Sequence, residues 1–181
     1  MSIKKSNLPL TSMLANSSYD YVDSFEGSFI DKNENIDAAK VGKAFFSSGP
    51  KWIEKLFSFR NAIVKRLGLK TPENILDRQK QLVAFKCEVG ERLGLFQVYH
   101  RDENEVIIGE DDKHLDFRVS LYLQPNGNNG HEKTLTLSTV VKFHSWLGRL
   151  YFFPVKPFHK LIVPTMLKSI INNLKATPNH Q

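Results

Sequence analysis

Residues 114–124 read HLDFRVSLYLQ, and this stretch decides the fold because its side chains alternate strictly in character. The side chains that share the apolar side of an extended chain are Leu115, Phe117, Val119, Leu121 and Leu123. The intervening side chains are mostly polar or charged. An alternation with a period of two predicts a β-strand with one buried face and one wet or polar face.

Similar alternation predicts strands before and after this stretch. Residues 19–29 form the expected first strand, and residues 93–100 pair with the run EVIIGEDD at 105–112 as a hairpin. The run TLTLSTVVKFH at 134–144 follows the turn composition of PNGNNGHE. The four later strands are therefore expected to form an antiparallel meander.

Helical spacing predicts two short helices after the first strand and one long helix at the end. Ala38, Val41 and Ala44 recur at helical intervals, and a second apolar stripe runs through residues 52–67. We expect the last helix to begin at Pro157, because proline suits a first turn, and to bend at Pro164. The order of elements indicates an α+β fold of the helix-grip type, in which a curved antiparallel sheet closes around the C-terminal helix.

Three motifs resemble those of one bacterial protein family. They are WIEKLFSFRNAIVKRLGLK at 52–70, GEDDKHLDFRVSLYL at 109–123 and HSWLGRLYFFPVKPFHKLIVP at 144–164. Together they are similar to domain-of-unknown-function family 2867, over about residues 20–174. The resemblance also implies the superfamily of START-like, pollen-allergen-like and polyketide-cyclase-like (SRPBCC) proteins. It brings no established activity and no catalytic residues.

The superfamily resemblance implies a cavity between the sheet and the last helix that holds a small hydrophobic molecule. On strand parity, the predicted wall is Leu93, Leu95, Gln97, Tyr99, Leu115, Phe117, Val119, Leu121, Leu135, Leu137, Thr139 and Val141. The polar members Gln97, Tyr99 and Thr139 are candidates to orient a ligand. The alternative is that each of them is satisfied within the protein.

Three further candidates lie at the expected mouth of this cavity. His159 stands near the predicted helix start, where an imidazole is able to bind a ligand or act as a base, or to make a structural hydrogen bond. Arg149 and Tyr151 follow the last strand and could contact an anionic group at the rim. An ion pair with the acidic residues 110–112 is the alternative for the arginine.

The chain of 181 residues suits one domain, expected at 19–176 between a flexible leader at 1–18 and a tail at 177–181. The net charge of +6 is dispersed, which argues against a nucleic-acid surface. The only cysteine, Cys87, predicts a buried thiol and a reducing cytoplasm. No apolar run has the length of a membrane span, and no histidine or cysteine spacing predicts a metal or cofactor site.

These observations favour a module that binds or carries a small hydrophobic molecule. The second hypothesis is an enzyme of cyclase or isomerase type that uses Tyr99, His159 or a carboxylate in the same cavity. The third is a protein-interaction scaffold, which would need a large exposed apolar patch. The ligand, any catalytic activity and the oligomeric state stay open at the level of sequence.

Overall fold

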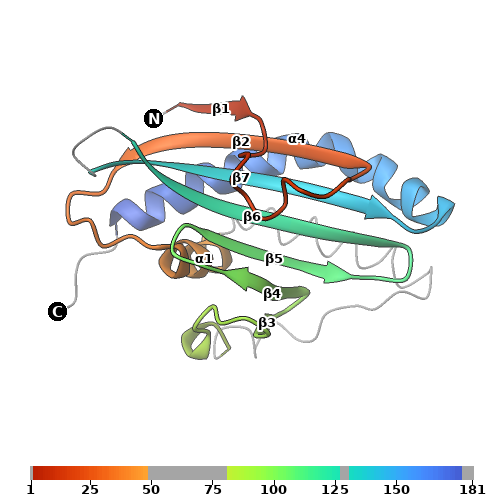
Figure 1. The fold of residues 1–181 in the computed structure, drawn as a ribbon, viewed down its shortest axis with the longest axis horizontal. Coiled ribbons are helices and arrows are strands. Elements are labelled where there is room, and N and C mark those ends of the chain that lie inside the picture. Colours follow the sequence, from red (N-terminus) through yellow and green to blue (C-terminus); the bar gives the residue numbers. More distant parts are fainter. Residues whose placement is uncertain (1, 49–80, 127–130, 177–181) are drawn as a thin grey trace.

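The computed structural model describes residues 2–48, 81–126 and 131–176, which include one antiparallel sheet and the helices α1 and α4 (Figure 1). The elements in chain order are β1 (Ile3–Ser6), β2 (Tyr21–Ile30), α1 (Ala38–Ser47), β3 (Arg92–Leu93), β4 (Phe96–Arg101), β5 (Glu105–Asp111), β6 (Leu115–Asn126), β7 (Glu132–Phe143) and α4 (Trp146–Ala176). The order of strands across the sheet is β1-β2-β7-β6-β5-β4-β3. This α+β arrangement is consistent with the helix-grip fold.

The alternation of β6 and β7 fixes which side of the sheet is buried. Leu121 lies opposite Leu137 and Leu123 opposite Leu135, so both strands turn their apolar sides the same way. Opposed residues in an antiparallel pair share a face, and a shift of one residue would expose the whole set. The predicted faces of these two strands are confirmed.

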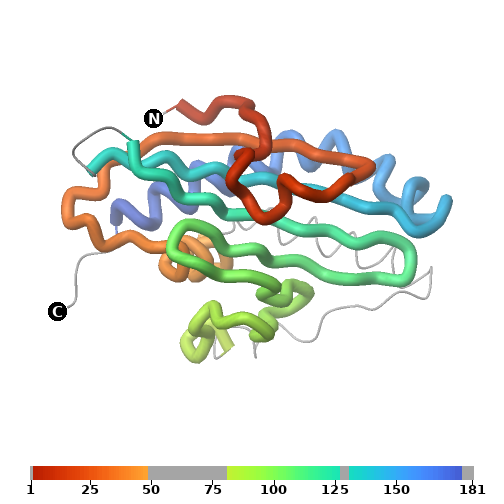
Figure 2. Tube along the Cα trace, in the orientation of Figure 1, coloured from red at the N-terminus to blue at the C-terminus, as the bar shows by residue number. Residues whose placement is uncertain are grey.

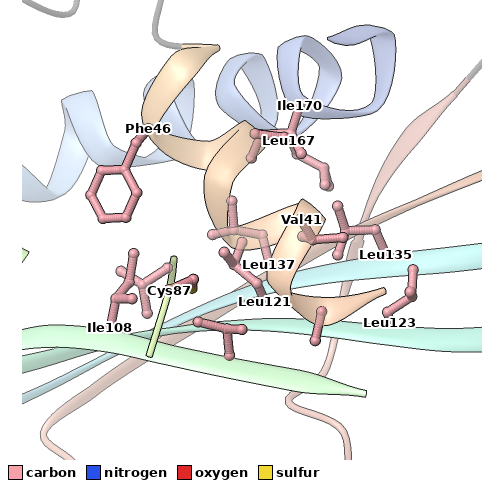
Figure 3. Close-up of a cluster of buried hydrophobic side chains, with 14 of the residues drawn as sticks. Val41, Phe46, Cys87, Ile108, Leu121, Leu123, Leu135, Leu137, Leu167 and Ile170 are labelled. Carbon is pink, nitrogen blue, oxygen red and sulfur yellow. The ribbon is translucent and has the colours of Figure 1, made fainter. Parts of the chain in front are cut away.

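Both helices cover this apolar side, which we call the helix-facing side. Leu167 and Ile170 of α4 are fully buried in one cluster with Val41 of α1 and with Leu135 and Leu137 of the sheet (Figure 3). Full burial of such a side chain stabilises a fold by about 1.5–3 kcal/mol. The second predicted short helix, at 52–67, lies outside the described residues.

A glycine allows α1 to lie close to the segment that precedes β3. A Cβ atom at Gly42 would collide with the Sγ atom of Cys87, which is itself completely buried. Burial also raises the pKa of the Cys87 thiol to about 11. The predicted buried thiol is confirmed. Asp37 caps the helix, since its side chain accepts a hydrogen bond of 2.7 Å from the backbone N–H of Lys40.

The C-terminal helix begins earlier than the sequence predicts. It starts at Trp146 rather than Pro157, and it contains Pro154, Pro157 and Pro164. Proline has no N–H, so each of the three removes one backbone hydrogen bond. Pro154 and Pro157 are exposed, and the helix continues through them because its opposite side is packed against the sheet.

The prediction for residues 93–100 is right for Leu93, which belongs to the core, but wrong for Gln97 and Tyr99. Leu93 and Phe96 pair across a turn that contains Gly94, whose φ of +62° suits glycine. The turn resets the alternation, so Phe96 and Val98 join the core, whereas Gln97 and Tyr99 turn to the other face. A register irregularity between Val98 and His100 follows in the same strand.

The N-terminal segment, residues 7–18, crosses the outer face of the sheet (Figure 2). The sequence predicts a flexible leader at residues 1–18, which includes this segment. The same range contains strand β1, which pairs with β2. Leu14 is buried with Ile107 and Val140, and Ser12 is 2% exposed.

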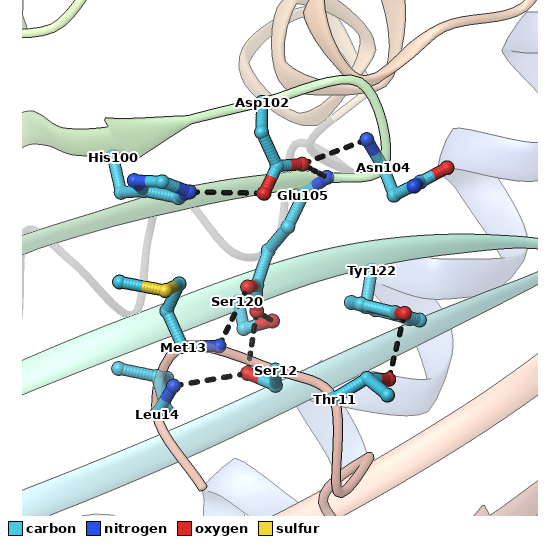
Figure 4. Close-up of polar contacts among 10 residues, drawn as sticks. All are labelled: Thr11, Ser12, Met13, Leu14, His100, Asp102, Asn104, Glu105, Ser120 and Tyr122. Carbon is cyan, nitrogen blue, oxygen red and sulfur yellow. Dashed lines mark hydrogen bonds and ion pairs between the residues drawn. The ribbon is translucent and has the colours of Figure 1, made fainter. Parts of the chain in front are cut away.

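A buried carboxylate fastens this segment to the sheet. Glu105 is 1% exposed and accepts hydrogen bonds from the Ser12 hydroxyl at 2.5 Å, the Met13 N–H at 2.9 Å and the Ser120 hydroxyl (Figure 4). A hydrogen bond to a charged group stabilises a fold more than one between neutral groups. A buried charge without hydrogen bonds is costly, so the three bonds to Glu105 hold the segment on the sheet.

We expect Glu105→Gln to release the N-terminal segment. The amide offers one acceptor oxygen where the carboxylate offers two, so the free energy of unfolding in urea should fall by about 1–3 kcal/mol. Cleavage by a protease within residues 7–18 should become faster. Glu103→Gln, at an exposed position, is the control. Unchanged stability and cleavage in Glu105→Gln would contradict the fastening role.

Candidate functional site

Two polar residues interrupt the apolar, helix-facing side of the sheet. Asp23 of β2 lies opposite Thr139 of β7, which in turn lies opposite Val119 of β6. All three therefore point toward the helices in one row. Asp23 is 7% exposed and Thr139 is 3% exposed.

The two oxygens of the Asp23 carboxylate differ in their contacts with the described residues. Its Oδ2 atom accepts a hydrogen bond of 2.7 Å from the Tyr21 hydroxyl and lies 3.2 Å from the Nδ1 atom of His159 on α4. Its Oδ1 atom and the Oγ1 atom of Thr139 are buried and have no hydrogen-bond partner among the described residues. We call Tyr21, Asp23, Thr139 and His159 the polar cluster.

Burial shifts the pKa of the tyrosine in this cluster. It raises the pKa of Tyr21 well above the ordinary value, and the hydrogen bond to Asp23 and its negative charge raise that pKa further. Tyr21 is thus a neutral donor to Asp23 at neutral pH. The pair of Asp23 and His159 resembles the carboxylate–imidazole arrangement that orients a histidine for proton transfer.

Aromatic rings close one end of the polar cluster. The Tyr21 ring lies 4.8 Å from that of Phe152 and 6.1 Å from that of His159, both edge-on. The ring centres of Phe152 and Phe143 lie 5.6 Å apart. Phe117, which is only partly buried, packs against both the main core and the apolar cluster that contains Phe152. The polar groups therefore lie in apolar surroundings.

The structure brings some of the predicted site residues together. Thr139 and His159 both belong to the polar cluster. Tyr151 packs beside Phe152 on the same half of α4. Arg149 lies near the start of β2, where its guanidinium donates a hydrogen bond of 2.9 Å to the Oδ1 atom of Asp20.

The other two predicted residues lie on the outer face of the sheet, away from the cluster. The Oε1 atom of Gln97 accepts a hydrogen bond of 3.0 Å from Arg92. The Arg118 guanidinium stacks 3.6 Å from the centre of the Tyr99 ring. Neither side chain faces the helices, so the predicted wall is wrong at these positions.

Sequence reasoning missed Tyr21 and Asp23 as site residues. Both fall on the aromatic face of the first strand, whose parity is visible as Tyr21, Asp23, Phe25 and Phe29. A carboxylate on an otherwise apolar strand face is the signal, since such a residue is rarely buried without a specific partner.

The acidic residues at the end of β5 and the start of β6 are held in separate ion pairs and do not form one cluster. Glu110 pairs with Arg92, Asp111 with Arg118, and Asp116 with His144. Within residues 2–48, 81–126 and 131–176, no three His, Cys, Asp or Glu side chains group as metal ligands. A pocket of about 490 Å³ does exist on the outer face, lined in part by Asn16, Tyr19 and Lys142. In the same ranges, no helix has the length and apolar character to cross a membrane.

Comparison with protein families places this chain in a family. The model of a family described as "Protein of unknown function (DUF2867)" matches residues 16–166. The matched range contains the whole polar cluster, including both ends of the contact between Asp23 and His159. Comparisons with curated proteins and with solved structures give no match.

We expect the raised pKa of Tyr21 to appear as a loss of stability in alkali. Above the ordinary tyrosine pKa of about 10, the unfolded chain releases this proton while the folded protein keeps it. Unfolding then releases a proton, so the free energy of unfolding falls as pH rises. Urea titrations at several pH values should show a shallower fall in Tyr21→Phe than in the wild type. Equal slopes would contradict the shift.

Proposed function

The chain belongs to the family described as "Protein of unknown function (DUF2867)", so we infer its activity from its own site. We propose that it binds a small, mainly hydrophobic molecule between the sheet and α4. The ligand's polar group would meet the polar cluster, and its apolar part would lie against the neighbouring aromatic and aliphatic side chains. Ligand pockets in proteins commonly combine an apolar lining with a few placed polar groups.

The observation that carries this proposal is a pair of buried oxygens, Asp23 Oδ1 and Thr139 Oγ1, that have no hydrogen-bond partner among the described residues. Most buried polar atoms have a hydrogen-bond partner, and a buried group without one costs about 1–3 kcal/mol. A ligand that donates a hydrogen bond to Asp23 would offset this cost. The proposed ligand class is therefore an apolar molecule with a hydroxyl or amino group.

The chain's architecture also supports the proposal. An antiparallel sheet against a long C-terminal helix favours placing the family in the superfamily of START-like, pollen-allergen-like and polyketide-cyclase-like (SRPBCC) proteins, which the motifs resemble. That superfamily implies a ligand between sheet and helix. The proposed compartment is the cytoplasm, as expected from a chain with a single, buried cysteine.

A second candidate function is an enzyme of cyclase or isomerase type. The specific observation in its favour is the 3.2 Å contact between Asp23 Oδ2 and His159 Nδ1. A carboxylate in this position orients the imidazole, as general acid–base catalysis requires. The two candidates share one site and differ in whether the ligand leaves chemically changed.

Thr139→Val separates a ligand-binding role from a structural one. It removes a buried hydroxyl that has no partner in the described structure, so the free energy of unfolding should stay equal or rise by up to about 1 kcal/mol. Ligand binding should weaken by about tenfold. Native mass spectrometry of the protein from its own cells should show extra mass in the wild type and less in the variant.

The matched control is Thr136→Val, the same change on the same strand but on the outer face. It should keep the bound mass. Absence of any bound mass, also after incubation with a panel of apolar alcohols and amines, would contradict the proposal. So would a Thr139→Val variant that binds as the wild type does.

His159→Gln distinguishes the enzyme from the carrier. If the second candidate is right, the wild type converts its bound molecule to a product of different structure, and the variant binds it without conversion. Chromatography of the released molecule before and after incubation is the measurement. Release of an unaltered molecule from the wild type would exclude this candidate and leave the binding module.

A further inference from the structure

The side of α4 opposite the polar cluster is exposed and apolar. Six of the twelve exposed large hydrophobic side chains in the described part of the chain lie within residues 146–161. They are Trp146, Leu147, Leu150, Phe153, Phe158 and Leu161, and Trp146 and Phe153 are 70% and 78% exposed. We call these six side chains the apolar stripe.

Helical spacing puts the stripe and a set of cations next to each other. Trp146, Leu150, Phe153 and Leu161 follow one another at intervals of three, four or eight residues, which keeps them on one side of a helix. Arg149, Lys156 and Lys160 are separated by seven and four residues, so they form one flank of that side. The whole of α4 contains no aspartate or glutamate.

We propose that this side of α4 docks on the surface of an anionic lipid bilayer. The apolar stripe would lie among the headgroups, and the flank of Arg149, Lys156 and Lys160 would lie against lipid phosphates. Helices with Trp, Phe and Leu on one side and with Lys and Arg beside them bind in this way. The proposal does not depend on the ligand site, which lies on the other side of the helix.

Two features favour a bilayer over a second copy of the chain. A symmetric pair would bring the cationic flanks of both copies to the same interface, where like charges repel. The carbonyl groups of Leu150, Phe153 and Lys160 also lack their usual helical donors, because Pro154, Pro157 and Pro164 have no N–H. These carbonyls need water, which the hydrated headgroup layer supplies.

The test is sedimentation of the full chain with vesicles of phosphatidylcholine alone or mixed with phosphatidylglycerol. Binding should require phosphatidylglycerol and should weaken as salt rises. The variant Leu150→Ser/Phe153→Ser should bind at least about tenfold more weakly. Val83→Ser/Val89→Ser, which removes two exposed apolar side chains elsewhere, is the matched control and should bind normally.

Charge is tested separately from apolar contact. Lys156→Glu/Lys160→Glu should abolish the preference for phosphatidylglycerol, whereas Lys32→Glu/Lys113→Glu makes the same change in net charge at other exposed sites and should keep most of it. Because Lys156 lies 5.5 Å from the Tyr21 ring, thermal unfolding of each variant is measured alongside.

Trp146, a member of the apolar stripe, gives a fluorescence readout in the wild-type protein without any substitution. The wild-type fluorescence should shift to shorter wavelength on vesicles, and the shift should be absent in Trp146→Phe. The proposal is overturned if the wild type binds neither vesicle, or if the stripe and control variants bind equally. It is also overturned if sedimentation shows a dimer that Leu150→Ser/Phe153→Ser dissociates.

Discussion

The contact between the second half of α4 and the middle of the sheet is the interaction on which the rest of the structure depends. Leu167, Ile170 and Ile171 are fully buried there, and they cover strands that would otherwise expose a continuous apolar face. β2 makes room for the helix at Gly27, where a Cβ atom would come within 3.0 Å of Ile171. This anchoring sets the direction of the whole helix, and with it the place of His159.

The first half of α4 packs against the sheet on one side and is exposed on the other. Its inner side carries His159 and Phe152 to the sheet, while its outer side carries exposed apolar residues and two of the three prolines. A proline inside a regular helix costs about 3 kcal/mol. The helix persists because its inner side is packed, and because the carbonyl groups left without donors belong to exposed residues that water can reach. Packing on one side thus permits an unusual sequence on the other.

The sequence predicts the fold well where one physical rule acts alone. β6 and β7 are continuous strands, so their alternation predicts their buried faces correctly. The alternation fails at β4 because the turn at Gly94 separates Leu93 from the next strand. The start of α4 is misplaced because proline usually marks a first turn, whereas packing carries the helix through it. Of the polar cluster, Thr139 and His159 are predicted as candidates, but the contact between Asp23 and His159 joins residues 136 positions apart and needs the three-dimensional arrangement.

Strand β1 has a consequence for how the protein behaves at high concentration. It is four residues long, carries Lys4 and Lys5, and forms one edge of the sheet. Short, charged edge strands are poor templates for pairing with another molecule. Without β1, the edge would be the ten-residue strand β2, whose free backbone groups would form a long ladder open to strand addition. The first few residues therefore protect against aggregation, a role separate from stability and from ligand binding.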